Sequence, residues 1–350
     1  MAEMNPVKKV RRDIKHPWGK SAPLDNEYLT RQAECFSNGV KISLETKLGK
    51  IKLRNPVMVA SGTFGYAEEF AELVDLKKLG AIVTKTITLN PRKGNLPPRI
   101  VETPCGILNA IGLENPGVED FIQEKLLFLK KIGVPIIVSI GGDKIEEFVE
   151  LTRRLSKEEG ISGLELNISC PNVQQATSHK PQATSQKLIA QDEDATYELV
   201  KAVRENTNLT LIAKLSPNVT DIVTIAKSAV KGGSDALSLI NTFSAMAIDI
   251  ETRKPKLGNI IGGLSGPAIK PLALKTVWEV AQQIDIPIIG MGGIMNWQDA
   301  LEFIIVGATA VAIGTANFVN PQSAFEIVQG LEDYLRKNKI ESIQELQKNT

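Results

Sequence analysis

The sequence predicts a (β/α)8 barrel, because eight short, nearly continuous apolar runs alternate with amphipathic stretches. Such runs are typical of parallel strands that are covered by helices. They span residues 56–60, 81–85, 135–140, 163–169, 209–215, 235–241, 286–292 and 309–315. The alternative is a doubly wound open sheet, but no GxGxxG motif follows the first run, which disfavours it.

Local patterns also predict a hairpin before the barrel and the start of one of its helices. Residues 41–54 (VKISLETKLGKIKL) predict a β-hairpin with a turn near Lys47–Gly49. Thr220 is expected to cap a helix that ends at Gly232–Gly233. We therefore expect residues 41–350 to form one catalytic barrel domain with long loops at the carboxyl ends of its strands.

Residues 1–40 form an N-terminal extension of different character. They contain the basic cluster KKVRRDIK and show no clear hydrophobic period. Two interpretations remain open, a segment draped over the surface and a docking arm for a partner or an anionic surface.

The composition excludes several classes of function. The chain has 350 residues, is 43% hydrophobic and 23% charged, and carries a net charge of +1. These values indicate no nucleic-acid or membrane partner. Two histidines and three widely spaced cysteines disfavour a metal centre or a Ser/His triad, and the odd number of thiols leads us to expect a cytoplasmic protein.

Three connections are too long for simple turns, and all of them follow predicted strands. They are residues 86–118, 171–195 and 242–268, and the last is expected to contain a hairpin around Arg253–Gly258. Long loops in a compact domain are usually functional, and barrel enzymes build their sites on this face.

The last two strands end in glycine-containing loops, GMGG at 290–293 and IGT at 313–315. Glycine lets backbone N–H groups approach an anion, and a following helix N-terminus favours negative charge. This pair of loops commonly binds phosphate in barrels. The alternative is a pair of tight turns without a ligand.

Lysines lie at the ends of two other strands, Lys85 beside Thr86 and Lys214. A lysine at the inward end of a buried strand is costly unless an anion meets it. That anion is either a ligand or a structural partner, for which Glu165 is the candidate.

Amide side chains also gather at predicted strand ends, namely Asn109, Asn167, Asn172 and Asn241 with Thr242. Amides offer hydrogen-bond donors and acceptors together, which suits a ring edge with alternating N–H and C=O groups, such as a pyrimidine. Each one alone could equally be a turn or cap residue.

Cys170 follows a strand on which alternation directs Glu165 and Asn167 into the barrel. The thiol could be a small buried filler. Pro171 and the polar surroundings disfavour that role, and no histidine lies nearby in the sequence to form a nucleophilic pair. A thiol can act as a nucleophile or as a general base, and these observations favour the base.

In order and spacing, the motifs resemble those of the class 1 dihydroorotate dehydrogenases, which are FMN enzymes of pyrimidine synthesis. The resemblance runs from about residue 41 to about 335 and rests on VMVASGTFGY, TKTIT, NAIGLENPG, NISCPN, LINT, GGLSGPA, GMGGI and AIGT. NAIGLENPG is most similar to the NAD-linked type 1B. That type implies a partner subunit with FAD and a [2Fe–2S] cluster, in a homodimer or a heterotetramer.

The resemblance also implies roles for individual residues. Cys170 would take a proton from C5 of dihydroorotate while a hydride leaves C6 for flavin N5, with Lys214 stabilising the charge on the reduced flavin. The implied FMN contacts are Ser61, Lys85, Thr86, Ser139, Asn167, Lys214, Ile240, Gly266, Gly292, Gly293, Gly314 and Thr315. The implied substrate contacts are Lys85, Asn109, Ala110, Ile111, Gly112, Leu113, Asn167, Asn172, Asn241 and Thr242.

The sequence departs from the family pattern in three places. A polar stretch at 173–188 replaces a glycine-rich one, Ser139 stands where Asn is common, and the N-terminal extension is unusual for type 1B.

Three alternative functions compete with the one that this resemblance implies. They are a flavin domain like that of dihydropyrimidine dehydrogenase, a tRNA dihydrouridine synthase and a non-catalytic flavin-binding subunit. The near-neutral charge disfavours the tRNA enzyme, and the intact Cys170 disfavours the non-catalytic subunit.

Overall fold

The computed structural model describes residues 42–168 and 189–349. Contacts divide the chain into Met1–Lys41 and Ile42–Thr350, and only the second unit is described below. Cys170, Asn172 and most of the connection 171–195 lie outside the described residues. The assignment of residues 41–350 to one catalytic domain stays a prediction.

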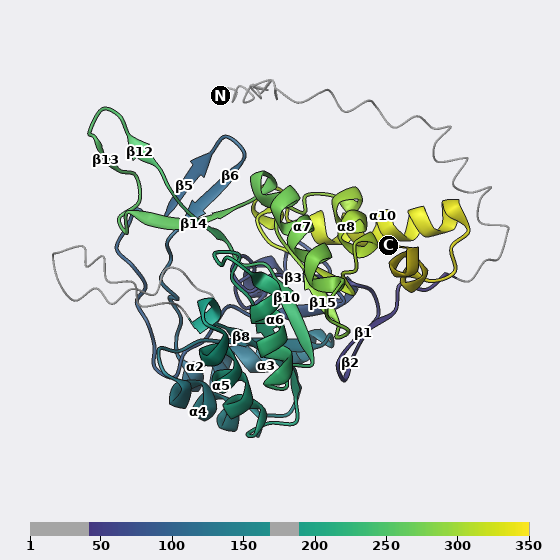
Figure 1. Ribbon diagram of the computed structural model, residues 1–350, viewed down its shortest axis with the longest axis horizontal. Helices are drawn as coiled ribbons and strands as arrows, with labels where there is room; N and C mark the ends of the chain where they lie inside the picture. Colours follow the sequence, from purple (N-terminus) through teal and green to yellow (C-terminus); the bar gives the residue numbers. More distant parts are fainter. Residues whose placement is uncertain (1–41, 169–188, 350) are drawn as a thin grey trace, which may run out of the picture. The chain divides into compact units, whose positions relative to one another are not determined.

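Eight parallel strands close into a barrel (Figure 1), as predicted, so the open-sheet alternative is wrong. Around the barrel the order of the strands is β10-β15-β16-β3-β4-β7-β8-β9. Their bounds are β3 (Val57–Val59), β4 (Ala81–Val83), β7 (Ile136–Ile140), β8 (Ile161–Asn167), β9 (Thr210–Lys214), β10 (Ala236–Leu239), β15 (Ile288–Gly290) and β16 (Ala310–Ile313). Seven of the eight apolar runs contain one of these strands, and the run 163–169 overlaps β8, which begins two residues before it.

Helices cover the outside of the barrel. They are α2 (Val118–Asp120), which continues through a π-helical turn (Phe121–Lys125) into α3 (Leu126–Ile132), α4 (Ile145–Leu155), α5 (Glu193–Arg204), α6 (Ile222–Lys231), α7 (Lys270–Ala281), α8 (Trp297–Ile305), α9 (Ala316–Val319) and α10 (Ser323–Asn338). Short 3-10 turns lie at Glu68–Phe70, Leu76–Lys78, Ile189–Gln191, Pro267–Ile269 and Ile343–Asn349. None of the helices within the described ranges is long and apolar enough to cross a membrane.

The cap of α6 differs from the prediction. Asp221, not Thr220, is the N-cap, and its carboxylate accepts hydrogen bonds from the backbone N–H groups of Val223 and Thr224. Both residue types are good caps, and the carboxylate also carries a charge that favours a helix N-terminus.

The predicted N-terminal hairpin closes one end of the barrel. Its strands are β1 (Thr46–Leu48) and β2 (Ile51–Leu53), joined by a turn at Gly49 and Lys50. Leu48, Ile51 and Leu53 are buried in one cluster with inward-facing residues of the barrel strands. Because they cover the amino ends of the strands, only the carboxyl ends can open into a binding site.

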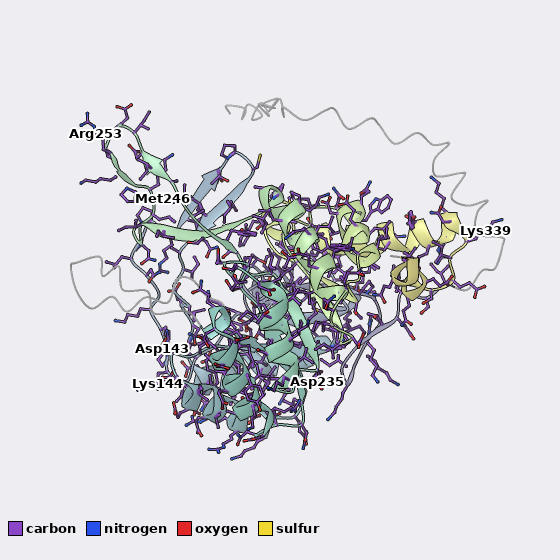
Figure 2. The ribbon with its side chains drawn as sticks, viewed as in Figure 1. Asp143, Lys144, Asp235, Met246, Arg253 and Lys339 are labelled. Carbon is purple, nitrogen blue, oxygen red and sulfur yellow. The ribbon has the colours of Figure 1, made fainter. Side chains whose placement is uncertain are left out.

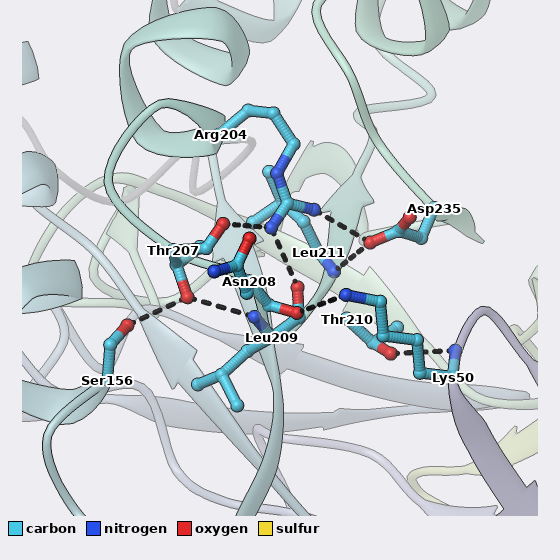
Figure 3. A network of polar contacts seen from close by, with 9 residues as sticks. All are labelled: Lys50, Ser156, Arg204, Thr207, Asn208, Leu209, Thr210, Leu211 and Asp235. Atoms are coloured by element: carbon cyan, nitrogen blue, oxygen red, sulfur yellow. Dashed lines mark hydrogen bonds and ion pairs between the residues drawn. The ribbon is translucent and has the colours of Figure 1, made fainter.

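Polar contacts fix the hairpin to the barrel (Figure 3). The Lys50 N–H donates to Thr210 Oγ1 at 3.0 Å, and its Nζ donates to the carbonyl of Asn208 at 2.8 Å. Arg204, at the end of α5, donates to the Asp235 carboxylate at 2.9 Å and to the Leu209 carbonyl at 3.0 Å. The network joins the hairpin, β9 and the start of β10 at the closed end.

A separate antiparallel sheet of order β11-β14-β6-β5 stands beside the barrel mouth. It consists of β5 (Ile100–Thr103), β6 (Gly106–Asn109), β11 (Phe243–Met246) and β14 (Ile261–Ser265), and a two-stranded tip, β12 (Ile248–Asp249) with β13 (Lys254–Pro255), extends beyond it. Met246 and Arg253 mark this projecting region in Figure 2. The hairpin predicted in residues 242–268 is present, but its tip turns at 250–253 and not at Arg253–Gly258.

We expect Leu48→Ala to lower the free energy of unfolding by about 2–5 kcal/mol, because it leaves a cavity where a fully buried side chain fills the closed end. Urea unfolding followed by circular dichroism measures the effect. The matched control is Leu127→Ala on α3. Leu127 is 54% exposed, so its replacement should change the free energy of unfolding by no more than about 0.5 kcal/mol. Equal unfolding midpoints for the two variants would contradict the sealing role of the hairpin.

Candidate active site

A cavity opens at the carboxyl ends of the barrel strands. Its lining comes from the carboxyl ends of β8, β9 and β16, from the segments that follow β3, β4, β10, β15 and β16, and from the neighbouring antiparallel sheet. The lining residues are Ala60, Ser61, Gly62, Thr63, Lys85, Thr86, Ile100, Ile107, Asn109, Ile111, Gly112, Leu113, Asn167, Lys214, Ile240, Asn241, Thr242, Ser265, Gly266, Ile269, Met291, Gly292, Gly293, Ile294, Met295, Ala312, Gly314, Thr315 and Phe318.

Most of the residues predicted for the site meet in this cavity. Every predicted FMN contact except Ser139 lines it, and so does every described substrate contact except Ala110. Ala110 is 1% exposed, and its N–H donates to the carbonyl of Arg99. Cys170 and Asn172 lie outside the described residues, so their positions relative to the cavity stay predictions.

The floor of the cavity carries a buried cation. Lys214 Nζ donates to Ser61 Oγ at 3.1 Å and lies 3.7 Å from Glu165 Oε1. The side chains of Lys214 and Glu165 are 7% and 1% exposed. Ion pairing with Glu165 was the structural alternative for this lysine, and it is present. Because Lys214 also lines the cavity, it can meet a ligand as well.

One wall holds a chain of hydroxyl and amide groups. Asn241 Nδ2 donates to Asn167 Oδ1 at 3.4 Å, and Asn167 Nδ2 donates to Thr86 Oγ1 at 2.9 Å. Behind them, the buried Ser139 Oγ lies 2.9 Å from Thr86 Oγ1. The chain fixes the orientation of the Asn167 amide. Ser139 does not line the cavity, and its hydroxyl is linked to the cavity wall through Thr86.

The glycine loop after β15 is held tightly. Gly292 and Gly293 have φ angles of 124° and 75°, and a Cβ on Gly293 would lie 2.7 Å from Lys270 Cβ. Only glycine adopts this backbone without strain. The loop after β16 is open, since the nearest atom to a Cβ on Gly314 would be Ala60 Cβ at 3.9 Å. A ligand can therefore approach the backbone at Gly314.

Asp299 on α8 braces the segment that follows the β15 loop. One carboxylate oxygen accepts the Met295 N–H at 2.9 Å, and the other accepts Lys270 Nζ at 2.7 Å. Glu302 also pairs with Lys270, at 3.0 Å. Burial lowers the pKa of Lys270, but the hydrogen bonds to Asp299 and Glu302 outweigh burial and raise the pKa above its usual value.

The antiparallel sheet supplies the opposite wall. Asn109 Nδ2 donates to the Gly263 carbonyl at 3.2 Å, which joins β6 to β14 through a side chain. Thr315 Oγ1 donates to Ser265 Oγ at 2.8 Å and so connects this sheet to the loop after β16. Hydrogen bonds from side chains to other side chains and to the backbone therefore hold both walls in place.

Sequence reasoning missed several lining residues, among them Ile107, Ser265, Met291, Ile294 and Phe318. Most are apolar, and nothing in their local pattern separates them from core residues. Ser265 lies in the GGLSGPA motif, which was the signal that could have identified it.

The family model for dihydroorotate dehydrogenase matches residues 43–335. The chain belongs to the dihydroorotate dehydrogenase family. Relatives from Geotalea uraniireducens and Geotalea daltonii are each 54% identical over 306 residues, which cover 87% of this chain and 97% of each relative. A relative from Desulforudis audaxviator is 52% identical over 307 residues, or 88% of this chain and 97% of its own length. All three are named dihydroorotate dehydrogenase B (NAD(+)), catalytic subunit.

The predicted family, its type 1B and the barrel are therefore confirmed. Dihydroorotate dehydrogenases are oxidoreductases of pyrimidine synthesis, and the comparisons support a flavin-dependent enzyme. The alternative of a non-catalytic subunit is not supported.

We expect Asp299→Ala to weaken flavin binding about tenfold or more, because the Met295 N–H and Lys270 lose the carboxylate that braces the loop. Equilibrium dialysis of the flavin measures the change. Glu302→Ala is the matched control: its side chain is 44% exposed and pairs with the same lysine but not with the loop, so binding should stay near the wild-type value. If both variants lose flavin affinity equally, the loss comes from the ion pairs of Lys270 and not from the hydrogen bond to Met295.

Proposed function

We propose that this chain binds FMN in the cavity and oxidises dihydroorotate to orotate, with Cys170 as the general base. The observation that carries the proposal is the arrangement of one cavity. It places the Thr86–Asn167–Asn241 chain and the buried Lys214 beside two glycine loops suited to a phosphate. This combination suits two molecules bound side by side, a cofactor with a phosphate and a polar ring and a substrate with a polar ring of its own.

Several features of the cavity fit FMN. Within the described residues, Ser61 Oγ is the one hydrogen-bond acceptor of Lys214 Nζ, so the ammonium retains N–H donors for a ligand. Gly292, Gly293, Gly314 and Thr315 would hold the phosphate through their backbone. When bound, FMN supplies the acceptor for the hydride that leaves C6 of dihydroorotate.

The remaining polar groups suit dihydroorotate, whose ring alternates N–H and C=O groups and carries a carboxylate. Asn109, Asn167 and Asn241 would pair with the ring edge, because each amide both donates and accepts. Lys85 is partly exposed in the cavity and forms no ion pair with any described carboxylate, so it would meet the substrate carboxylate.

Cys170 lies three residues beyond Asn167, the last residue of β8. Three residues extend at most roughly 10 Å. This spacing along the chain is compatible with a thiol that acts on a substrate bound by Asn167. As a base, Cys170 would take the proton from C5 as the hydride leaves C6, and the remaining electron pair forms the C5=C6 bond of orotate.

The electron acceptor of the chain would be a second protein. The relatives are named catalytic subunits of an NAD(+) enzyme. This supports a partner subunit that carries FAD and a [2Fe–2S] cluster, in a heterotetramer built on a homodimer of this chain.

Cys170→Ser should slow the bleaching of the bound flavin by dihydroorotate about 10²–10⁴-fold at neutral pH. A serine hydroxyl loses its proton far less readily than a cysteine thiol, so much less of the basic form is present to accept the C5 proton. Anaerobic stopped-flow absorbance measures the rate, with FMN content as the control for folding. A variant that retains FMN and bleaches at the wild-type rate would refute the base assignment. A wild-type protein without flavin would refute the proposed function.

Lys85→Met should weaken orotate binding about 10–100-fold, because the variant loses a charge-assisted contact with the carboxylate. Titration of the flavin spectrum with orotate gives the dissociation constant. Lys93→Met is the control, since Lys93 is an exposed lysine that does not line the cavity. A weakening of similar size in both variants would indicate a general charge effect and not a contact.

A further inference from the structure

Glu165 is a buried carboxylate that the proposed reaction does not use. It lies on β8 and is 1% exposed, and it is not among the residues that line the cavity. Its Oε2 accepts a hydrogen bond from Ser238 Oγ on β10 at 3.2 Å. Its Oε1 has no hydrogen-bond partner among the described residues and lies 3.7 Å from Lys214 Nζ.

The pair stands out among the side chains of the barrel strands. Within the described part of the barrel strands, Glu165 and Lys214 are the charged side chains that are buried. Both belong to neighbouring strands, with Glu165 beside Ile212 and Asn167 beside Lys214 in the register of β8 and β9. Burial reduces screening by water, so each charge acts strongly on the other and on a ligand above them.

Lys214 can contact a ligand in the cavity, whereas Glu165 cannot. Lys214 lines the cavity and holds Ser61, whereas Glu165 lies behind it. Glu165 can therefore act on a bound ligand only by holding the ammonium in place and by offsetting its positive charge.

This offset has a consequence for a flavin. Acceptance of a hydride from dihydroorotate brings two electrons and one proton, so FMN gains one negative charge. A positive charge at the cavity floor stabilises that charge, and a carboxylate behind the ammonium reduces the stabilisation. The ion pair therefore sets how strongly the site favours reduced FMN over oxidised FMN.

We propose that Glu165 is a positioning residue that lowers the reduction potential of bound FMN by partly cancelling the charge of Lys214. The inference rests on the proposed function, because it requires FMN above Lys214. A lower potential favours onward transfer of electrons from the flavin to the acceptor, at the cost of a smaller driving force for dihydroorotate oxidation.

The test is a redox titration of FMN bound to the full chain, with an indicator dye, for wild type and Glu165→Gln. Glutamine keeps the shape of the side chain and removes its charge. We expect the ratio of affinities for reduced and oxidised FMN to rise at least tenfold, which shifts the two-electron potential by about 30 mV in the positive direction. Ser238→Ala is the matched control, because it removes the hydrogen bond to Oε2 but leaves both charges, and its potential should stay near wild type.

A Glu165→Gln protein that holds FMN at the wild-type potential would overturn the inference and leave the proposed function intact. If this variant does not fold, Glu165→Asp replaces it, since aspartate keeps the charge but withdraws it from Lys214. The expected shift then has the same sign and a smaller size, and an unchanged potential again overturns the inference. Wild-type protein that binds no FMN would instead remove the proposed function itself.

Discussion

Closure of the barrel at its amino end decides where the polar side chains of the strands can meet. The barrel interior is filled by side chains such as Met58, Ile137, Ile212 and Ile289, and the β1–β2 hairpin covers the amino ends of the strands. The strands are short, and β3, β4 and β15 have three residues each. Polar side chains at their carboxyl ends therefore have a single place to meet, which is the open mouth.

The mouth becomes a cavity because two distant loops pair with each other. The connection after β4 contributes β5 and β6, the connection after β10 contributes β11 and β14, and β14 pairs with β6 in antiparallel register. This pairing satisfies backbone groups that two separate long loops would leave to water. It also gives Asn109 and Thr242 a rigid support, since Gly263 packs directly against Thr242.

Features that depend on local sequence pattern could be predicted from the sequence. Features that depend on residues far away in the chain could not. The eight strands followed from apolar runs, and the inward direction of Glu165 and Asn167 followed from alternation along β8. The pairing of β14 with β6 could not be read from either loop alone, because antiparallel register is set by the partner. Ser139 stands where the family commonly has Asn, and its place behind Thr86 depends on how β4 and β7 meet. The cap of α6 was misplaced by one residue because Thr220 and Asp221 are both acceptable caps.

The two lysines of the cavity differ in a way that fits two different ligands. Lys214 is buried, and a buried ammonium without a counter-charge would be costly, so Glu165 and Ser61 keep it in place before any ligand arrives. Lys85 is partly exposed, and water can satisfy its charge while it has no carboxylate partner among the described residues. A fixed cation suits a cofactor that stays bound through many turnovers, whereas a hydrated cation suits a substrate that must leave after each one. In the proposed function, burial therefore favours Lys214 as the contact of the flavin and Lys85 as the contact of the substrate carboxylate, a division that residue type alone could not provide.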